Sequence, residues 1–473
     1  MTATDRAHHA EALPAAGYFR SEAEPRGGLD AGWFFGAYVV AVMALPSNLT
    51  IPALGAAGQP SSVIGLIALV WWIGAQLNRS SATLAPAQPV RRALLVFAVA
   101  VLASYVAATT RPIEALELSG ADRGLLQIAS LLGVALLASD GLVGLRRMES
   151  PLRLLVFLGG VVGVIGILQF ATGAALVDVI QIPGLSPNTD LTSVYDRGGF
   201  NRAAGTSIHP LEFGVLLSMV LPLALHFAIL DTHRSLVLRW FPVAAIAIAV
   251  PITVSRSAVL AVVVVLVIVL PTWPRVRRRV AYGAIGALLV FVYVAIPGML
   301  GTLTRLFTGI SDDGSARSRT DSYALAWEFI EKHPFFGRGF STFLPQYRIL
   351  DNQYLGLLIE LGVIGTAAFV GLLVVVMRTA VLSRRGSADP RTRSLAQALL
   401  ALVAAAACGF ATFDAFGFPQ VTAALFLGIG AIGALSNTMR QESLLSAPIG
   451  PSASAAGERA AGRPAGRRTS GPS

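Results

Sequence analysis

Apolar segments recur along almost the whole chain, and they leave few ways for it to fold. Each approaches the ~20 residues that a helix needs to cross a bilayer. Only 13% of the residues are charged, whereas a soluble domain carries about 25%. We therefore predict an all-α polytopic membrane protein with about twelve transmembrane helices, at 32–46, 61–77, 93–109, 124–139, 154–171, 209–230, 241–254, 257–272, 281–299, 353–377, 395–413 and 419–436.

The short link Ser255-Arg256 leaves one alternative open, because the seventh and eighth segments could form a single broken helix. Basic residues indicate the orientation. With a cytoplasmic N-terminus, the inner loops carry 17 basic residues in about 66 positions and the outer loops 11 in about 129. Basic residues concentrate on the cytoplasmic side. Both termini are predicted to be cytoplasmic, and the net charge of +10 requires no nucleic-acid partner.

Composition divides the chain into three predicted regions. Residues 1–31 form a polar cytoplasmic segment without a signal-peptide pattern. Residues 32–437 form the transmembrane domain, with a large extracytoplasmic loop at about 299–352 between the ninth and tenth helices. Residues 438–473 are rich in Ala, Gly, Pro, Ser and Arg and predict a disordered basic cytoplasmic tail.

The large loop contains its own helical pattern over 320–332. Tyr323, Ala326, Trp327 and Ile330 recur at helical spacing and predict one apolar stripe. Pro334 is expected to end this helix, because proline disfavours helical geometry in the preceding residue. An amphipathic helix here is expected to lie on the membrane surface or to cap a cavity.

Two arginines are candidates for anion binding. Arg256 lies between two apolar runs, where a charge is costly and usually has an anionic partner; snorkelling to the head groups is the alternative. Arg202 precedes a Gly-Thr-Ser turn and a helix start, which favours anions. His209 at that start is a further candidate, or only a polar residue that begins the helix.

Asp351 and Glu360 are the acidic candidates. Asp351 is placed to act as a general base, or Asp351-Asn352 only caps the helix. Glu360 lies deeper in the same apolar segment, as a site residue or an anchor between helices. Further candidates for substrate binding lie in the large loop, where each basic residue could instead be a solvated charge: Arg319, His333 and Arg338.

Several chemistries find no support in the sequence. The six histidines are scattered, no metal-ligand spacing appears, and Cys408 is the single cysteine. No phosphate-binding glycine loop follows a strand. We therefore predict neither a metal nor a cofactor.

Four motifs in order resemble the O-antigen ligase and polysaccharide polymerase superfamily of bacterial membrane glycosyltransferases. The first is Arg-Ala-Ala-Gly-Thr-Ser-Ile-His-Pro-Leu-Glu-Phe-Gly (202–214), and the second is Ser-Arg-Ser-Ala (255–258). The third is His-Pro-Phe-Phe-Gly-Arg-Gly-Phe (333–340), and the fourth runs from Asp-Asn-Gln-Tyr-Leu to Glu-Leu-Gly-Val-Ile-Gly (351–365).

The resemblance implies a metal-independent transferase at the outer face of the cytoplasmic membrane, in cell-surface polysaccharide biosynthesis. Its donor would be a glycan on undecaprenyl diphosphate and its acceptor a glycan or lipid. Membrane lipid, and possible other polysaccharide-assembly proteins, would be its partners. On this mapping, Arg202 and Arg256 would bind the diphosphate.

One position departs from the ligase pattern of His-Asn, nine residues and Gly-x-x-Gly. Asn352, Gly362 and Gly365 fit it, but Asp351 stands in the histidine position. This favours a polymerase or another member that joins glycan units, with a ligase close behind. The competing hypotheses are a transporter or lipid-linked-glycan flippase, which the absence of half-repeats disfavours, and a non-catalytic partner in polymer export.

Overall fold

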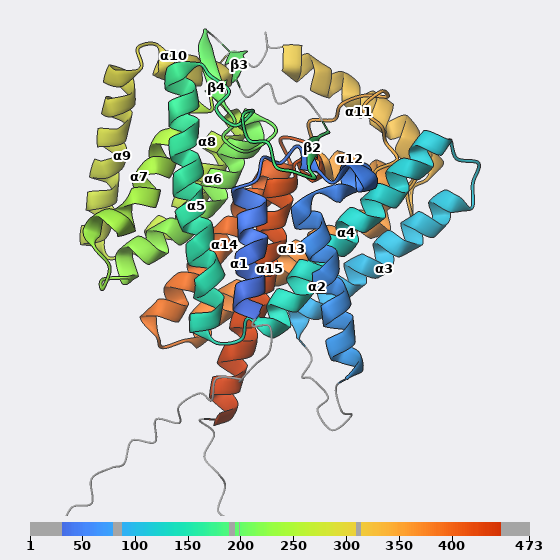
Figure 1. The fold of residues 1–473 in the computed structure, drawn as a ribbon, viewed down its shortest axis with the longest axis horizontal. Coiled ribbons are helices and arrows are strands. Elements are labelled where there is room, and N and C mark those ends of the chain that lie inside the picture. The colour runs from blue at the N-terminus through green and yellow to red at the C-terminus, as the bar shows by residue number, and fades with distance from the viewer. Residues whose placement is uncertain (1–30, 79–87, 189–193, 198, 309–313, 446–473) are drawn as a thin grey trace, which may run out of the picture. The chain divides into compact units, whose positions relative to one another are not determined.

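A computed structural model describes residues 31–78, 88–188, 194–197, 199–308 and 314–445. The structure is mostly helical, at 77%. The described helices are α1 (Ala31–Met43), α2 (Pro60–Leu77), α3 (Pro89–Thr109), α4 (Ala115–Gly141), α5 (Leu145–Thr172), α6 (Pro210–Leu230), α7 (Leu236–Ile252), α8 (Arg256–Val269), α9 (Arg275–Ala295), α10 (Met299–Thr308), α11 (Gly314–Lys332), α12 (Gln353–Glu360), α13 (Gly362–Gly386), α14 (Pro390–Phe410) and α15 (Pro419–Leu445) (Figure 1).

Within the described residues, nine helices are long and apolar enough to cross a membrane. Three shorter apolar helices cover 31–43, 236–252 and 256–272. The prediction of a helical polytopic membrane protein is therefore confirmed, whereas the count of twelve spans stays a prediction. The last helix continues to Leu445, beyond the predicted end at 436. The predicted N-terminal segment, apart from residue 31, and the tail from 446 lie outside the described residues.

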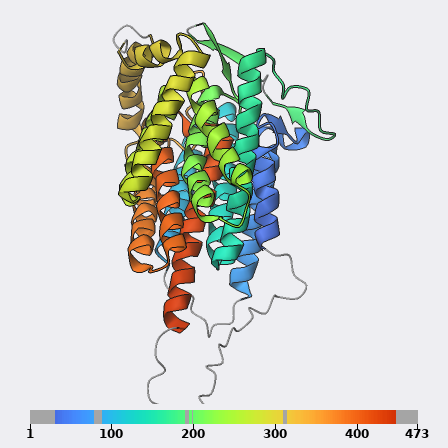
Figure 2. The ribbon, with the colours of Figure 1, turned by 90° about the vertical axis from the view of Figure 1, so that its left-hand side faces the viewer.

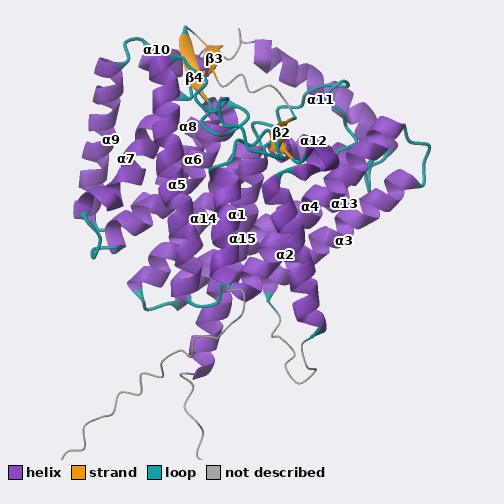
Figure 3. Cartoon of the chain, viewed as in Figure 1, coloured by secondary structure: helices purple, strands orange, loops and turns teal. Residues whose placement is uncertain are grey.

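Long helices run alongside one another between two ends (Figure 2). Both antiparallel strand pairs lie at one of these ends (Figure 3), which we call the strand end. The pairs are β1 (Leu49–Thr50) with β2 (Ser186–Pro187), and β3 (Val194–Arg197) with β4 (Phe200–Ala203). The strand end also carries the loops that hold most of the predicted site residues.

The seventh and eighth predicted segments are separate antiparallel helices rather than one broken helix. The turn between α7 and α8 packs on the first turn of α6, where a Cβ on Gly214 would lie within 2.8 Å of Thr253 and Ala258 side-chain atoms. At the other end of α8, Val269 lines a cavity together with Ile229 near the end of α6. α7 follows α6 and runs back to the start of α6. Because α8 begins at the start of α6 and ends near its other end, α8 runs parallel to α6 and antiparallel to α7.

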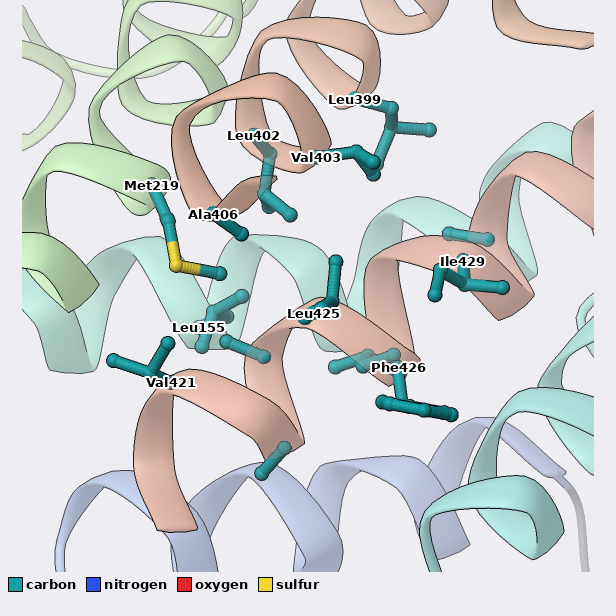
Figure 4. Packing of buried hydrophobic residues seen from close by; sticks show 14 of the residues in the cluster. Leu155, Met219, Leu399, Leu402, Val403, Ala406, Val421, Leu425, Phe426 and Ile429 are labelled. Atoms are coloured by element: carbon teal, nitrogen blue, oxygen red, sulfur yellow. The ribbon is translucent and has the colours of Figure 1, made fainter. Parts of the chain in front are cut away.

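Of the nine long apolar helices in the described residues, α15 is the most buried, and it packs against α4, α6 and α14. Figure 4 shows Leu425 of α15 pointing toward Leu402 of α14, while Phe426 of the same helix points to another side. Small residues permit this approach, because Gly430 of α15 lies against α4 backbone atoms, as small residues do between membrane helices. Packing of this kind holds the helices that carry the site.

An ion-pair network ties three helices together at the end opposite the strands. Glu149 of α5 accepts hydrogen bonds from Arg153 and Arg391, and Asp231 after α6 accepts from the same two guanidiniums. Both carboxylates are buried. Because each acid has two arginine partners, the buried negative charges of this network are compensated.

The helix predicted at 320–332 is present as α11 and starts earlier, at Gly314. It ends at Lys332, ahead of Pro334, as predicted. Its apolar face differs from the predicted stripe, because Ala326 and Ile330 are buried while Tyr323 and Trp327 are 54% and 61% exposed. The buried side chains pack against α12. The helical period therefore predicted the helix correctly, but not which side chains of the apolar stripe are buried.

The tenth predicted segment is divided, because the chain turns between α12 and α13. Gly362 has φ +64°, a conformation that residues with a Cβ rarely adopt. Segment 334–339 fills this break: the N–H groups of Arg338 and Gly339 donate to Ile359 and Glu360, and Val363 donates to Pro334. A Cβ on Gly337 would lie 2.3 Å from the Glu360 carbonyl. The Gly337-Arg338-Gly339 turn is therefore a fixed part of the packing.

The substitution Gly362→Ala tests this junction. A Cβ there would lie 2.4 Å from the Phe335 carbonyl oxygen and adopt a strained φ. We expect a loss of about 1–3 kcal/mol from strain alone, measured as a lower unfolding temperature in detergent. Gly371→Ala in the same helix is the control, because a Cβ at Gly371 meets nothing within 4 Å. Equal unfolding temperatures for both variants would contradict the role of the junction.

Candidate functional site

Two of the predicted site arginines meet at the α7–α8 turn. Arg202 on β4 is 7% exposed, and its Nε donates to the Thr253 carbonyl at 2.8 Å. Arg256 is the first residue of α8 and is half-buried. The hydrogen bond places Arg202 on the turn that carries Arg256, although 54 positions separate them in the sequence. The structure thus supports the predicted proximity of these two residues.

The turn that holds the arginines is strained and tightly packed. Val254 has φ +46°, which is rare for a β-branched residue. Ser255 caps α8 by accepting from the Ala258 N–H, and Thr253 donates to the Val250 carbonyl. Surrounding structure must stabilise such a conformation, and strain of this kind clusters at functional sites.

The start of α6 is stabilised within the protein. The Glu212 carboxylate accepts from the N–H groups of Ile208 and Gln420, at 3.0 and 2.8 Å. The Gln420 side chain also donates to Thr206 and to the Val42 carbonyl, and Ser207 donates to Gln420. A carboxylate of the protein therefore occupies the place where the sequence predicted an affinity for anions.

His209 is the N-terminal cap of α6. Its Nδ1 accepts from the Leu211 N–H at 3.1 Å, and its ring lies near Phe418. This geometry agrees with the alternative that His209 is a polar residue that begins the helix. Its predicted role in substrate binding stays a hypothesis.

Asp351 and Asn352 have different positions at the start of α12. Asn352 is the cap, since its Oδ1 accepts from the N–H groups of Tyr354 and Leu355 at 3.0 and 3.3 Å. Asp351 precedes the cap and is half-buried. The capping role that the sequence offered for this pair is therefore filled by Asn352.

A cavity of about 440 Å³ lies beside this helix start, at the strand end. Leu350 and Asn352, on either side of Asp351, line it. Four charged residues also line the cavity: Arg123, Arg348, Glu360 and Asp414. Glu360 accepts from the Phe343 N–H at 3.2 Å. Arg202, Arg256 and Asp351 are not among the residues that line this cavity. The basic turn is therefore distinct from the cavity, and Asp351 borders it only through its neighbours Leu350 and Asn352.

Asp414 was missed by the sequence analysis. It lies in the short loop between α14 and α15, deep among neighbouring side chains but exposed to the cavity. Burial, and to a smaller degree the Asp351 carboxylate, raises the pKa of Asp414 to about 6, against the opposing Gly417 N–H. The sequence signal that could have indicated Asp414 is its position as the acidic residue of the aromatic stretch Phe413–Phe418, between two apolar segments.

The large loop attaches Arg338 to the start of α4. Its guanidinium donates to Glu117, which also accepts from Arg111 and from the Tyr347 hydroxyl. The same guanidinium lies 4.7 Å from the Phe329 ring centroid. These contacts give Arg338 a structural role, and its predicted part in substrate binding is untested.

His333 lies directly after α11, near the same cluster. Partial burial and the positive charges of Arg111, Arg338 and Lys332 lower its pKa, which favours the neutral imidazole. Arg319 belongs to α11, but its side chain lies outside the described residues. Among the described residues, no group of three or more His, Cys, Asp or Glu side chains has a geometry that could hold a metal ion.

The fold and these residues define a multi-pass helical membrane protein with a basic turn and a polar cavity at one end. Residues 241–370 match the family model described as O-Antigen ligase. This match supports the O-antigen ligase and polysaccharide polymerase superfamily and a ligase- or polymerase-type membrane function in polysaccharide biosynthesis. No curated protein matches the chain.

The matched region runs from α7 into α13. It contains Arg256 and the α12–α13 junction, whereas Arg202 and the first predicted motif precede it. The family implies lipid-linked glycan substrates. The match assigns no role to an individual residue.

Separate substitutions at the start of α12 distinguish its cap from its acid. Asn352→Ala removes the acceptor of two N–H groups, so we expect it to lower the free energy of unfolding by about 1 kcal/mol. Asp351→Ala keeps that acceptor and is expected to change stability less. Chemical or thermal unfolding in detergent measures both. A larger loss in Asp351→Ala than in Asn352→Ala would contradict this assignment.

The raised pKa of Asp414 predicts a pH-dependent stability. Its folded-state pKa of about 6 exceeds the ordinary value of 3.8, so the folded protein binds this proton more tightly than the unfolded chain. The free energy of unfolding is expected to fall as pH rises from about 4 to about 6. Asp414→Asn should remove that part of the profile, and parallel unfolding-temperature profiles for variant and wild type would refute it.

Proposed function

We propose that this protein transfers a glycan from an undecaprenyl-diphosphate donor to a glycan acceptor at the outer face of the cytoplasmic membrane. The observation that carries the proposal is the convergence of Arg202 and Arg256 on the rigid α7–α8 turn. Two guanidiniums beside a helix N-terminus suit a diphosphate, because both the charges and the N–H dipoles favour anions.

The proposed reaction is a nucleophilic substitution at the sugar carbon bonded to the diphosphate. The acceptor oxygen forms the new bond as the carbon–oxygen bond to diphosphate breaks, and the electron pair leaves with the lipid diphosphate. Negative charge grows on the leaving group, where fixed guanidiniums stabilise it most. The strained turn supports this role because its packing holds the donors before the reaction begins.

The proton released by the acceptor is assigned to Asp351. Asn352 provides the cap of α12, so helix formation does not require the Asp351 carboxylate. The adjacent cavity of about 440 Å³ has carboxylate, amide and guanidinium groups in its wall, which suit the hydroxyl-rich surface of a glycan. We assign the acceptor to this cavity and the donor diphosphate to the basic turn.

A carboxylate rather than an imidazole at position 351 favours a polymerase that joins glycan units, with ligase activity as the nearest alternative. The proposal does not require a metal ion, because the arginines supply the positive charge. Arg319, Arg338, His209, His333 and Glu360 are retained as proposed substrate contacts of lower priority, since several of them have structural partners in the protein.

Substitution of the turn arginines tests the proposal. Removal of one transition-state donor costs on the order of 100-fold in rate, so Arg256→Ala and Arg202→Ala should each reduce polymer or conjugate by about that factor. Lipid-linked glycan should then accumulate in the outer leaflet. The measurement compares lipid-linked and surface glycans in a host that depends on this chain.

Arg275→Ala is the matched control for Arg256→Ala, because each residue is the first of an apolar helix. Its glycan profile should equal that of the wild type, provided that all variants reach the membrane in equal amounts. Unchanged glycans in both turn variants would refute the proposed catalysis. Accumulation in the inner leaflet would instead support the flippase hypothesis.

A further inference from the structure

A second cavity lies at the end of the helices opposite the strands. It has a volume of about 260 Å³ and is bounded by α6, the α8–α9 connection and the α13–α14 connection. Three arginines from different segments line it: Arg277, Arg384 and Arg393. The side chains that line the cavity also include Trp273 and the apolar Leu225 and Val269.

Among the described residues, no carboxylate compensates the positive charge of this cavity. The residues that line it include no Asp or Glu. The nearby buried acids Glu149 and Asp231 are paired with Arg153 and Arg391, neither of which lines the cavity. Within the described part of the chain, the guanidiniums of the three lining arginines form no hydrogen bond or ion pair.

The position of Arg277 gives a second reason to expect an anion. It lies in the first turn of α9, which contains no acidic residue and has no side-chain cap. The positive end of a helix dipole disfavours cations, so helix stability does not explain this residue. A general excess of arginine on one membrane side explains charged loops, but not the convergence of three segments on one cavity.

Exposed apolar side chains lie on the two helices that border this cavity. Val267 of α8 is 67% exposed, and Val276 of α9, next to Arg277, is 73% exposed. A headgroup held by the arginines would therefore have its acyl chains beside exposed apolar helix surface. A lipid can use this apolar surface, whereas a soluble phosphate cannot.

We propose that this cavity binds the phosphodiester headgroup of an anionic phospholipid, in the leaflet that the charge distribution predicts to be cytoplasmic. Arg277, Arg384 and Arg393 contact the phosphate oxygens through their guanidiniums. Trp273 lies at the level of the headgroups, as tryptophan does at membrane interfaces. The site is separate from the basic turn and does not depend on the proposed glycosyl transfer.

Lipid titration of the purified full-length protein in nonionic detergent tests the site. Phosphatidylglycerol is the probe, and native mass spectrometry measures its dissociation constant. A basic residue near an anionic surface contributes on the order of a fivefold change in affinity. Each single Arg→Gln variant should therefore bind about fivefold more weakly. The triple variant Arg277→Gln, Arg384→Gln, Arg393→Gln should bind on the order of 100-fold more weakly.

A matched triple variant removes the same charge outside the cavity: Arg275→Gln, Arg279→Gln, Arg385→Gln. These neighbours are exposed and do not line the cavity. The control should keep the wild-type affinity within about twofold, if contact rather than net charge is responsible. Both triple variants are compared by unfolding temperature, and the single variants replace the test triple if it does not fold.

Three results would overturn the proposal. Equal loss of affinity in both triple variants would reduce the effect to general electrostatics. Equal binding of phosphatidylcholine and phosphatidylglycerol would remove the need for an anionic headgroup. Displacement of phosphatidylglycerol by millimolar inorganic phosphate, with no greater affinity for the lipid, would assign the cavity to a soluble anion.

Discussion

The hydrogen bond from Arg202 to the Thr253 carbonyl illustrates a requirement that applies to the whole molecule. Backbone groups within a bilayer must find partners in the protein, because lipid offers none. Two places near the strand end leave carbonyl groups outside regular helix bonding: the turn between the antiparallel helices α7 and α8, and the break between α12 and α13. At the first, a buried guanidinium takes the freed carbonyl. At the second, the Ser104 hydroxyl and the N–H groups of segment 334–339 take them.

These two places explain why segments far apart in the sequence meet at the strand end. A turn or break between membrane helices needs a second segment to supply donors, so each one fixes the position of a distant part of the chain. The arginines proposed to bind the diphosphate lie at the α7–α8 turn. The proposed base precedes α12, whose other end is the α12–α13 break. The requirement for backbone partners thus places the chemistry as well as the fold.

The sequence predicted what depends on local composition. Apolar length indicated the nine long apolar helices of the described residues, although it joined α12 to α13. The amphipathic period indicated α11, Pro334 placed its end, and the Arg256 environment indicated the basic turn. It did not predict the break at Gly362, because periodicity carries no information on a positive φ. Nor did it predict Asp414 at the cavity or the hydrogen bond from the Gln420 N–H to the Glu212 carboxylate. Both depend on α15 packing beside segments that lie far away in the chain.

The junction between segment 334–339 and Gly362 also limits how relatives of this protein can exchange parts. Gly337 and Gly362 lie so close to the backbone of the other segment that a side chain at either position would collide with it. An outer loop transplanted from a relative up to Pro334 would be joined to a segment 334–339 from the other protein. A transplanted α13 would likewise lack the segment that fits its own break. A functional chimera should therefore carry residues 334–365 as one unit, so that recombination within this family follows the junction rather than the ends of the helices.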